Sequence, residues 1–207
     1  MIVAPKGEEV AFNALGLTQE RLIYEDEPIR DGYTWQQVVK LHADEYTDAD
    51  YILFVDSDCV FFTKVTPEYF FTDSKPYLLC TPYSLLGNTV PWKPGTDFVV
   101  GRDTPYEFMR RHPMMYHRDT LKAFRDYILA TFGKTCREFM LENCSKRRLS
   151  EFNILGAFTY FHRPTDFHWI DTDCNLYPPD CLKQFWSYEG VDGVKNAKEL
   201  AKLKPLL

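Results

Sequence analysis

Two carboxylates separated by a single residue are the strongest chemical feature of the sequence. Asp56-Ser57-Asp58 directly follows an apolar run over residues 51–55. Burying unpaired carboxylates is costly, so a strand of this kind must deliver them to an open edge or to a cation. Oxygen ligands at positions i and i+2 of a turn can share one Mg²⁺ or Mn²⁺. The spacing therefore predicts a divalent metal site at the end of a buried strand, with Asp56 and Asp58 as ligands.

The same carboxylate pair is compatible with several kinds of protein. The simplest alternative is an acidic turn that caps the next segment. A nucleotide-sugar transferase holds a cation on a diphosphate with such a pair, whereas a haloacid-dehalogenase-type phosphatase would use Asp56 as its nucleophile. A two-metal phosphoryl transferase would need further carboxylates, for which Asp171 and Asp173 are the nearest candidates. The phosphatase motif normally opens its fold, but here a strand–helix–strand–helix pattern precedes it.

The composition narrows the class of protein. The chain has 207 residues, of which 45% are hydrophobic and 16% aromatic, so it is long and apolar enough for one domain with a sizeable core. Its formal net charge of −6 argues against a nucleic-acid partner. No apolar run approaches the roughly 20 residues of a membrane span.

The spacing of the six cysteines indicates the redox state of the cellular compartment. They are widely spaced and form no CxxC pair, which favours reduced thiols and a cytoplasmic setting. Cys174 and Cys181 are the candidate pair for a disulfide.

Alternating strand and helix patterns predict an α/β fold with a mixed, mainly parallel sheet flanked by helices. The expected strands cover residues 2–4, 21–24, 51–55, 75–80, 114–117 and 167–170. The expected helices cover residues 8–15, 32–46, 119–132, 150–161 and 194–203, with Asp119 and Ser150 as caps, and residues 83–104 read as a functional loop. In such folds, ligands bind at the carboxyl ends of the strands. We expect a single domain over residues 1–207, compatible with one module of a longer polypeptide, in which residues 1–65 bind nucleotide and metal and residues 75–190 bind acceptor and sugar.

Three segments together resemble the GT-A class of glycosyltransferases. Residues 32–41 read GYTWQQVVKL, residues 51–62 read YILFVDSDCVFF, and residues 150–153 read SEFN. Bacterial, phage and viral transferases of this class carry a GY-x-x-QQ-x-x-K-L helix, a YxLxxDxDxxF strand and an SE(Y/F) helix. Within that set the chain is most similar to viral enzymes of capsid glycan synthesis. The resemblance implies a GT-A-like domain that transfers a hexose from a UDP-sugar, with UDP-glucose as the leading donor, to a glycan or glycoprotein acceptor, using Mn²⁺ or Mg²⁺.

The resemblance also assigns expected roles near the nucleotide. Pro5 and Lys6 end the first strand, where GT-A folds seat the nucleotide, and Glu25 ends the second, a usual place for a uracil contact. Asp56 and Ser57 would contact the ribose or the nucleotide. A solvated acidic loop is the alternative for Glu25.

Other residues would act on the sugar and the acceptor. Lys40 is expected at the diphosphate and Gln36 at the sugar, although both could be ordinary helix-surface residues. Glu151 is the expected catalytic carboxylate, stabilising an oxocarbenium-like state or attacking it in a retaining reaction. A favourable acidic residue in the first turn of a helix is the alternative for Glu151. His117 is the expected base of an inverting mechanism or an acceptor contact.

The sequence departs from the family at the third metal ligand. Glycogenin-like members supply a histidine from a C-terminal HxxGxxKPW motif, which this chain lacks. Gln184-Phe185-Trp186 lies in roughly that region. The third protein ligand stays open, and water or diphosphate oxygens could fill the shell.

Overall fold

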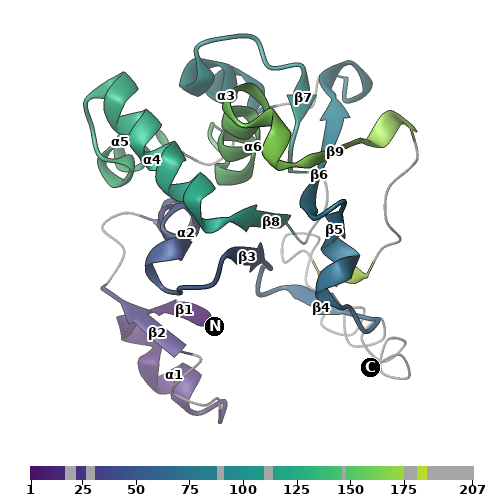
Figure 1. The fold of residues 1–207 in the computed structure, drawn as a ribbon. Helices are drawn as coiled ribbons and strands as arrows, with labels where there is room; N and C mark the ends of the chain where they lie inside the picture. Colours follow the sequence, from purple (N-terminus) through teal and green to yellow (C-terminus); the bar gives the residue numbers. More distant parts are fainter. Residues whose placement is uncertain are drawn as a thin grey trace.

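The computed structural model describes residues 1–16, 22–26, 31–87, 91–109, 114–145, 148–174 and 181–185. Within these ranges the chain is a mixed α/β protein with several small sheets and six α-helices. In Figure 1, helices α2 to α6 gather on one side of the paired strands β3 and β8, and α1, β1 and β2 form a separate corner. None of the described helices has the length and apolarity that crossing a membrane requires. The helix expected over residues 194–203 lies outside the described residues.

The first strands and helices form close to where the sequence predicts them. Strand β1 (Ile2–Pro5) pairs in parallel with β2 (Leu22–Glu25), and the short helix α1 (Glu9–Asn13) lies between them in the chain. Helix α2 (Gly32–Leu41) begins after Asp31, whose carboxylate accepts a hydrogen bond from the Thr34 backbone N–H at 2.9 Å. An acceptor at this position satisfies a free helix N–H and fixes where the helix starts.

The buried face of α2 differs from the expected one. The spacing of Trp35, Val38, Val39, His42 and Tyr46 in the sequence predicts one buried face. Val38 and the C-cap residue His42 are buried, but the other buried residues of the helix are Thr34, Gln37 and Leu41. Thr34 and Gln37 are polar, so an apolar pattern alone misplaces part of the face.

Strand β3 (Tyr51–Phe54) ends just before the acidic pair and pairs antiparallel with β8 (Met114–His117). We expected both faces of this strand to be covered, as in a parallel sheet. Instead Ile52 and Phe54 are buried while Tyr51 is exposed, so β3 buries mainly one face. That alternation is typical of antiparallel strands.

The remaining strands pair mainly antiparallel, so the prediction of a mainly parallel sheet is wrong. Strand β4 (Cys59–Phe61) pairs antiparallel with β10 (Leu182–Gln184). Strand β6 (Lys75–Pro82) pairs antiparallel with β5 (Phe71–Thr72) and β7 (Tyr106–Glu107), and in parallel with β9 (His168–Asp171). Among the described strands, only β1–β2 and β6–β9 are parallel. The β5–β6 hairpin turns through Asp73 and Ser74, which both have positive φ, the geometry that suits a tight two-residue turn.

Three helices were missed or capped differently. Helix α3 (Lys93–Val100) occupies part of the expected loop over 83–104, and α5 (Cys136–Asn143) was not predicted at all. Helix α4 (Arg118–Phe132) is capped by His117, whose Nδ1 accepts from the Asp119 backbone N–H, and not by the Asp119 side chain. Thr135 and Glu138 form a reciprocal capping box at the start of α5.

Helix α6 (Glu151–His162) is the central element of the core, and all of its first nine residues are buried. Ser150 precedes it but makes no side-chain cap; its hydroxyl lies 2.8 Å from the Met109 sulfur. A Cβ added at Gly156 would lie 2.4 Å from the Cβ of Phe108. Helix α6 can therefore pack this closely against Phe108 only because residue 156 has no side chain.

Replacing Gly156 by alanine should lower the free energy of unfolding by about 1–3 kcal/mol, the usual cost of overpacking a core. The better helix propensity of alanine offsets only part of that loss. Urea denaturation measures the change. Gly32, the first residue of α2, has nothing within 4 Å of its added Cβ and is the matched control. Gly32→Ala should change stability by less than about 1 kcal/mol; similar losses in both variants would contradict the close packing of α6.

Candidate active site

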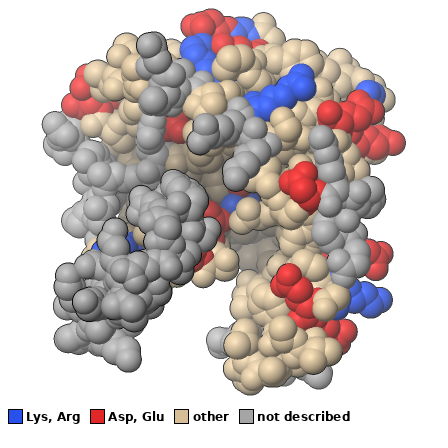
Figure 2. Space-filling view, turned by 180° about the vertical axis from the view of Figure 1, so that it is seen from behind, with Lys and Arg blue, Asp and Glu red and all other residues tan. Residues whose placement is uncertain are grey.

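Three segments that are distant in the sequence meet at one lysine. The Lys40 Nζ lies 2.6 Å from Asp56 Oδ1 and 2.8 Å from Glu151 Oε1. The side chains of Lys40, Asp56 and Glu151 are 14%, 20% and 8% exposed, so the cluster is largely withdrawn from water. Figure 2 shows the described surface hollowed beneath the helices, with basic and acidic side chains together in the recess.

Each member of this cluster is fixed by an element of the fold. Lys40 projects from the last turn of α2, Asp56 follows the end of β3, and Glu151 is the first residue of α6. The Glu151 backbone N–H donates to the Gln37 side-chain oxygen at 3.0 Å, which ties α6 to α2. The Lys40 ammonium also lies 4.6 Å from the centre of the Phe152 ring, a favourable distance for a cation and an aromatic face.

The carboxylates of Glu151 and Asp56 keep the Lys40 side chain positively charged. Burial by itself lowers the pKa of this amine, but the carboxylates of Glu151 and Asp56 outweigh burial and raise the pKa above its ordinary value. Lys40 is therefore a permanent cation between two carboxylates. Such a cation lets both acids remain close together without repelling each other.

Two glutamines complete the surroundings of the acidic pair. The Gln36 amide nitrogen lies 3.4 Å from Asp56 Oδ1. The Gln184 amide nitrogen lies 3.1 Å from Asp58 Oδ1 and 3.5 Å from Asp56 Oδ2, so one amide group bridges the two carboxylates. Strand β10 holds Gln184 in place, because the next backbone N–H, that of Phe185, donates to the Asp58 carbonyl at 2.8 Å.

The residues around Asp56 and Asp58 fit a hard divalent cation. Oxygen atoms of both carboxylates face the same amide group of Gln184 and so share one small space. Carboxylate and amide oxygens are ligands that Mg²⁺ and Mn²⁺ accept. Within the described ranges no group of three or more His, Cys, Asp or Glu side chains could hold a metal ion. The fit therefore depends on two carboxylates together with neutral oxygen donors.

The expected nucleotide residues lie at the end of the β1–β2 pair. Pro5 and Glu25 are directly opposite each other in its register, and Lys6 is exposed in the 3-10 helix that follows β1. The Glu25 carboxylate lies 4.0 Å from Arg137. Burial, then the hydrogen bond to Glu25, raises the pKa of the Tyr46 hydroxyl. No described contact joins this group to Asp56, whereas Ser57 is exposed in the turn between the two acids.

His117 is the one expected catalytic residue that the structure places away from the acidic pair. It lies opposite Tyr51 in the β3–β8 register, at the start of β3, whereas Asp56 follows the end of that strand. Its ring centre is 5.1 Å from that of Tyr51, and its Nδ1 caps α4. These contacts describe a helix cap, and the role expected of His117 in the reaction has no geometric support.

The carboxylates that a phosphatase or a two-metal enzyme would add have other surroundings. Asp171 ends β9, accepts a hydrogen bond from the Asp173 backbone N–H, and contacts the Tyr106 hydroxyl. No described contact connects Asp171 or Asp173 with Asp56.

The sequence did not single out Gln37 as a site residue, and it placed Gln184 only in the approximate region of the missing third metal ligand. Gln37 is 1% exposed on the face of α2 that also buries Val38 and Leu41. A polar residue at helical spacing within a buried face signals an internal hydrogen bond, and that signal was available. Gln184 carries no comparable local signal, because its partners are 126 and 128 residues away.

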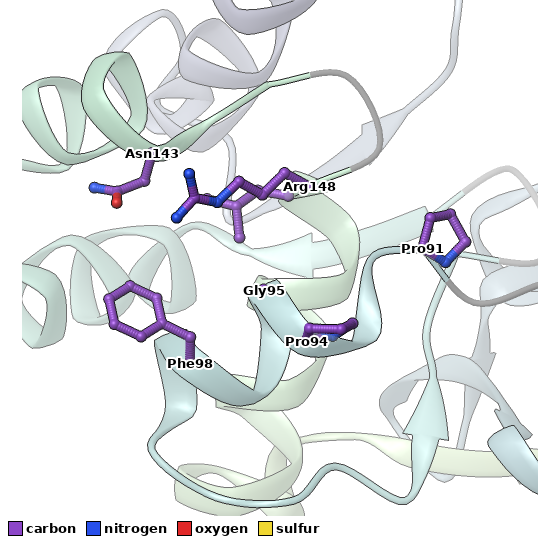
Figure 3. A pocket seen from close by; sticks show the side chains of 7 residues that line it. Pro91, Pro94, Gly95, Phe98, Asn143 and Arg148 are labelled. Carbon is purple, nitrogen blue, oxygen red and sulfur yellow. The ribbon is translucent and has the colours of Figure 1, made fainter.

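A separate cavity lies between α3 and the end of α5 and has a volume of about 360 Å³. Figure 3 shows Phe98, Pro94 and Gly95 of α3 on one side of it, with Asn143 and Arg148 opposite. None of the expected site residues lines this cavity. It is a different place in the fold from the Lys40 cluster.

Comparisons of the chain with family models, with curated proteins and with solved structures found no match. The functional assignment therefore depends on the sequence motifs and on the geometry around Asp56.

The thiol beside the acidic pair should be unreactive. Burial, followed by the charges of Asp58 and Asp56, raises the pKa of Cys59 to about 12. Because only the thiolate is nucleophilic, iodoacetamide at about pH 8.5 should alkylate Cys59 at least ~10-fold more slowly in the native protein than in the urea-unfolded chain. Peptide mass spectrometry reads each cysteine separately. Asp58→Asn should accelerate the native reaction, and a rate that is equal in the folded and unfolded chains would contradict the charged surroundings of Cys59.

Proposed function

We propose that this protein is a metal-dependent glycosyltransferase that moves a hexose from a UDP-sugar to a glycan or glycoprotein acceptor with retention of configuration. The observation that carries the proposal is the contact of Lys40 with both Asp56 and Glu151. Those three residues come from the three motifs that resemble GT-A transferases, and they meet although 111 residues separate Lys40 from Glu151. A role in viral capsid glycan synthesis and UDP-glucose as donor are suggested by the resemblance alone.

The acidic pair is suited to hold the donor through a cation. Asp56 and Asp58 would bind Mn²⁺ or Mg²⁺ at the end of β3. Such a cation, when bound, neutralises charge that develops on the leaving diphosphate. Lys40, whose ammonium already contacts Asp56, would add a second positive charge beside that diphosphate, and the exposed Gln36 would donate a hydrogen bond to the sugar.

Glu151 is suited to act on the sugar. In the transfer, the bond between the anomeric carbon and the diphosphate oxygen breaks, and UDP leaves with the electron pair. The anomeric carbon then bonds to the acceptor oxygen, whose proton passes to the departing phosphate oxygen. A carboxylate near the anomeric carbon stabilises the positive charge of the transition state or attacks that carbon. Lys40 and the Gln37 contact to the Glu151 backbone hold this carboxylate in place.

The phosphatase and the non-catalytic nucleotide-sugar-binding module remain as alternatives, and no contact among the described residues favours either. A binding module would not require the buried Glu151 carboxylate beside the acidic pair.

A panel of nucleotide-sugars with Mn²⁺ tests the proposal, with thermal stability and nucleotide release as the two measurements. We expect a UDP-sugar to raise the melting temperature only with the metal and to release UDP slowly by hydrolysis when no acceptor is added. Binding without any release would indicate the binding module. Beryllofluoride binding at Asp56 without UDP binding would indicate the phosphatase.

A further inference from the structure

We infer that Gln184 is the third protein ligand of the cation, through its side-chain carbonyl oxygen, and that this ligand makes the site selective for hard cations. The inference rests on the proposed metal site at Asp56 and Asp58. It concerns the region in which the sequence departs from the family it resembles, where the histidine motif of glycogenin-like members is missing.

The backbone fixes Gln184 over the acidic turn. Strand β10 pairs with β4 so that Gln184 lies opposite Cys59, the residue directly after Asp58. The pairing continues past this point, since the Phe185 N–H donates to the Asp58 carbonyl. Two main-chain contacts therefore flank the glutamine, and its side chain needs no loop movement to reach the carboxylates.

The distances suit a shared coordination shell. The terminal amide nitrogen of Gln184 is 3.1 Å from Asp58 Oδ1 and 3.5 Å from Asp56 Oδ2. Neighbouring oxygen ligands of an octahedral Mg²⁺ with bonds of about 2.0–2.1 Å lie about 3 Å apart. An oxygen at the position of this nitrogen would thus lie at ligand spacing from the Asp58 oxygen and about 0.5 Å beyond it from the Asp56 oxygen.

A half-turn of the amide places an oxygen there. The two ends of a glutamine side chain are nearly equal in size, one donating and the other accepting hydrogen bonds. Without a cation, the carboxylates attract the N–H end, as the structure shows. With a cation between the acids, the attraction reverses, and the carbonyl oxygen becomes the favoured end.

This ligand has a consequence for metal choice. Two carboxylates and an amide give three oxygen ligands from the protein, a set that suits Mg²⁺ and Mn²⁺. An imidazole in the same place would favour Zn²⁺ and other later transition metals. The glutamine should therefore keep Mg²⁺ competitive with Zn²⁺, and changing it to histidine should remove that property.

The test uses the whole chain and measures free Mn²⁺ by electron paramagnetic resonance, with and without UDP, followed by competition with Mg²⁺ and Zn²⁺. Gln184→Met keeps the length of the side chain but removes its oxygen, and we expect at least a tenfold loss of Mn²⁺ affinity. Gln184→His should retain Mn²⁺ binding while raising the preference for Zn²⁺ over Mg²⁺ at least tenfold. Lys183→Met is the matched control, because the neighbouring residue of a strand points to the opposite face.

The outcomes separate this inference from the proposed function. If Gln184→Met and Gln184→His both match the unaltered protein in affinity and selectivity, Gln184 is not a ligand, and the proposed function stands. If the unaltered protein binds no Mn²⁺ with or without UDP, the proposed function fails and the inference with it. If Gln184→Met does not fold, the selectivity of Gln184→His decides.

Discussion

Replacing Glu151 by glutamine should lower the turnover number by about 10²- to 10⁴-fold, the range expected when one charged catalytic group is lost. Donor affinity should stay within about threefold, because a carboxylate in the role proposed for Glu151 acts mainly on the transition state. Glutamine keeps the shape of the side chain and can still accept a hydrogen bond from Lys40, so the surroundings are preserved. Steady-state kinetics of sugar transfer, together with calorimetry of UDP-sugar binding, measures both quantities.

The control for this experiment addresses the possibility that Glu151 only stabilises the start of a helix. Glu138 does so at α5, where it completes a capping box with Thr135. Glu138→Ala should lower stability slightly, because the capping box is lost, and leave turnover unchanged. If Glu151→Gln behaves in the same way, with stability reduced and turnover retained, Glu151 is a helix-start residue and the catalytic assignment is wrong.

Replacing Asp58 by alanine should abolish metal-dependent UDP binding, with a loss in affinity of about 100-fold or more once a carboxylate ligand is gone. The fold should survive, because Asp58 lies in a turn and its described partners are the Gln184 amide, the Cys59 thiol and a backbone N–H. Calorimetry with UDP and Mn²⁺ measures the affinity, and thermal melting reports the fold.

Asp50 provides the matched control, since it is an exposed acid next to the opposite end of the same strand. Asp50→Ala should leave the affinity for UDP and Mn²⁺ within about twofold, because a charge effect at that distance is screened by salt. Unchanged Mn²⁺-dependent affinity in Asp58→Ala would show that the acidic pair is not the metal site.

Local patterns predicted the elements that carry the acidic pair. The apolar run before Asp56 forms β3, and the amphipathic segment around Lys40 forms α2. In both cases the signal lies within a few residues of the feature, where hydrophobic periodicity and end signals are strong. The capping box of α5, formed by Thr135 and Glu138, is an equally local signal, yet that helix was not predicted.

Strand partners and contacts between residues far apart in the sequence could not be predicted from local patterns. The antiparallel pairing of β3 with β8 depends on residues far along the chain, and a run such as 51–55 does not specify the direction of its neighbour. The contact of Lys40 with Glu151 has the same origin, since it requires α2 and α6 to pack together. His117 was predicted as a catalytic residue because its side chain can act as a base. In the structure its Nδ1 accepts a hydrogen bond from the Asp119 backbone N–H and caps α4.

The pairing of β10 with β4 has a consequence for the order in which the surroundings of the acidic pair form during synthesis. Gln184 follows Asp58 by 126 residues. A ribosome-bound chain can therefore display the acidic turn and Lys40 long before the strand that closes over them has emerged. Since pairings of such separation form late in folding, the acidic turn would gain its contact with Gln184 only after residue 184 has left the ribosome.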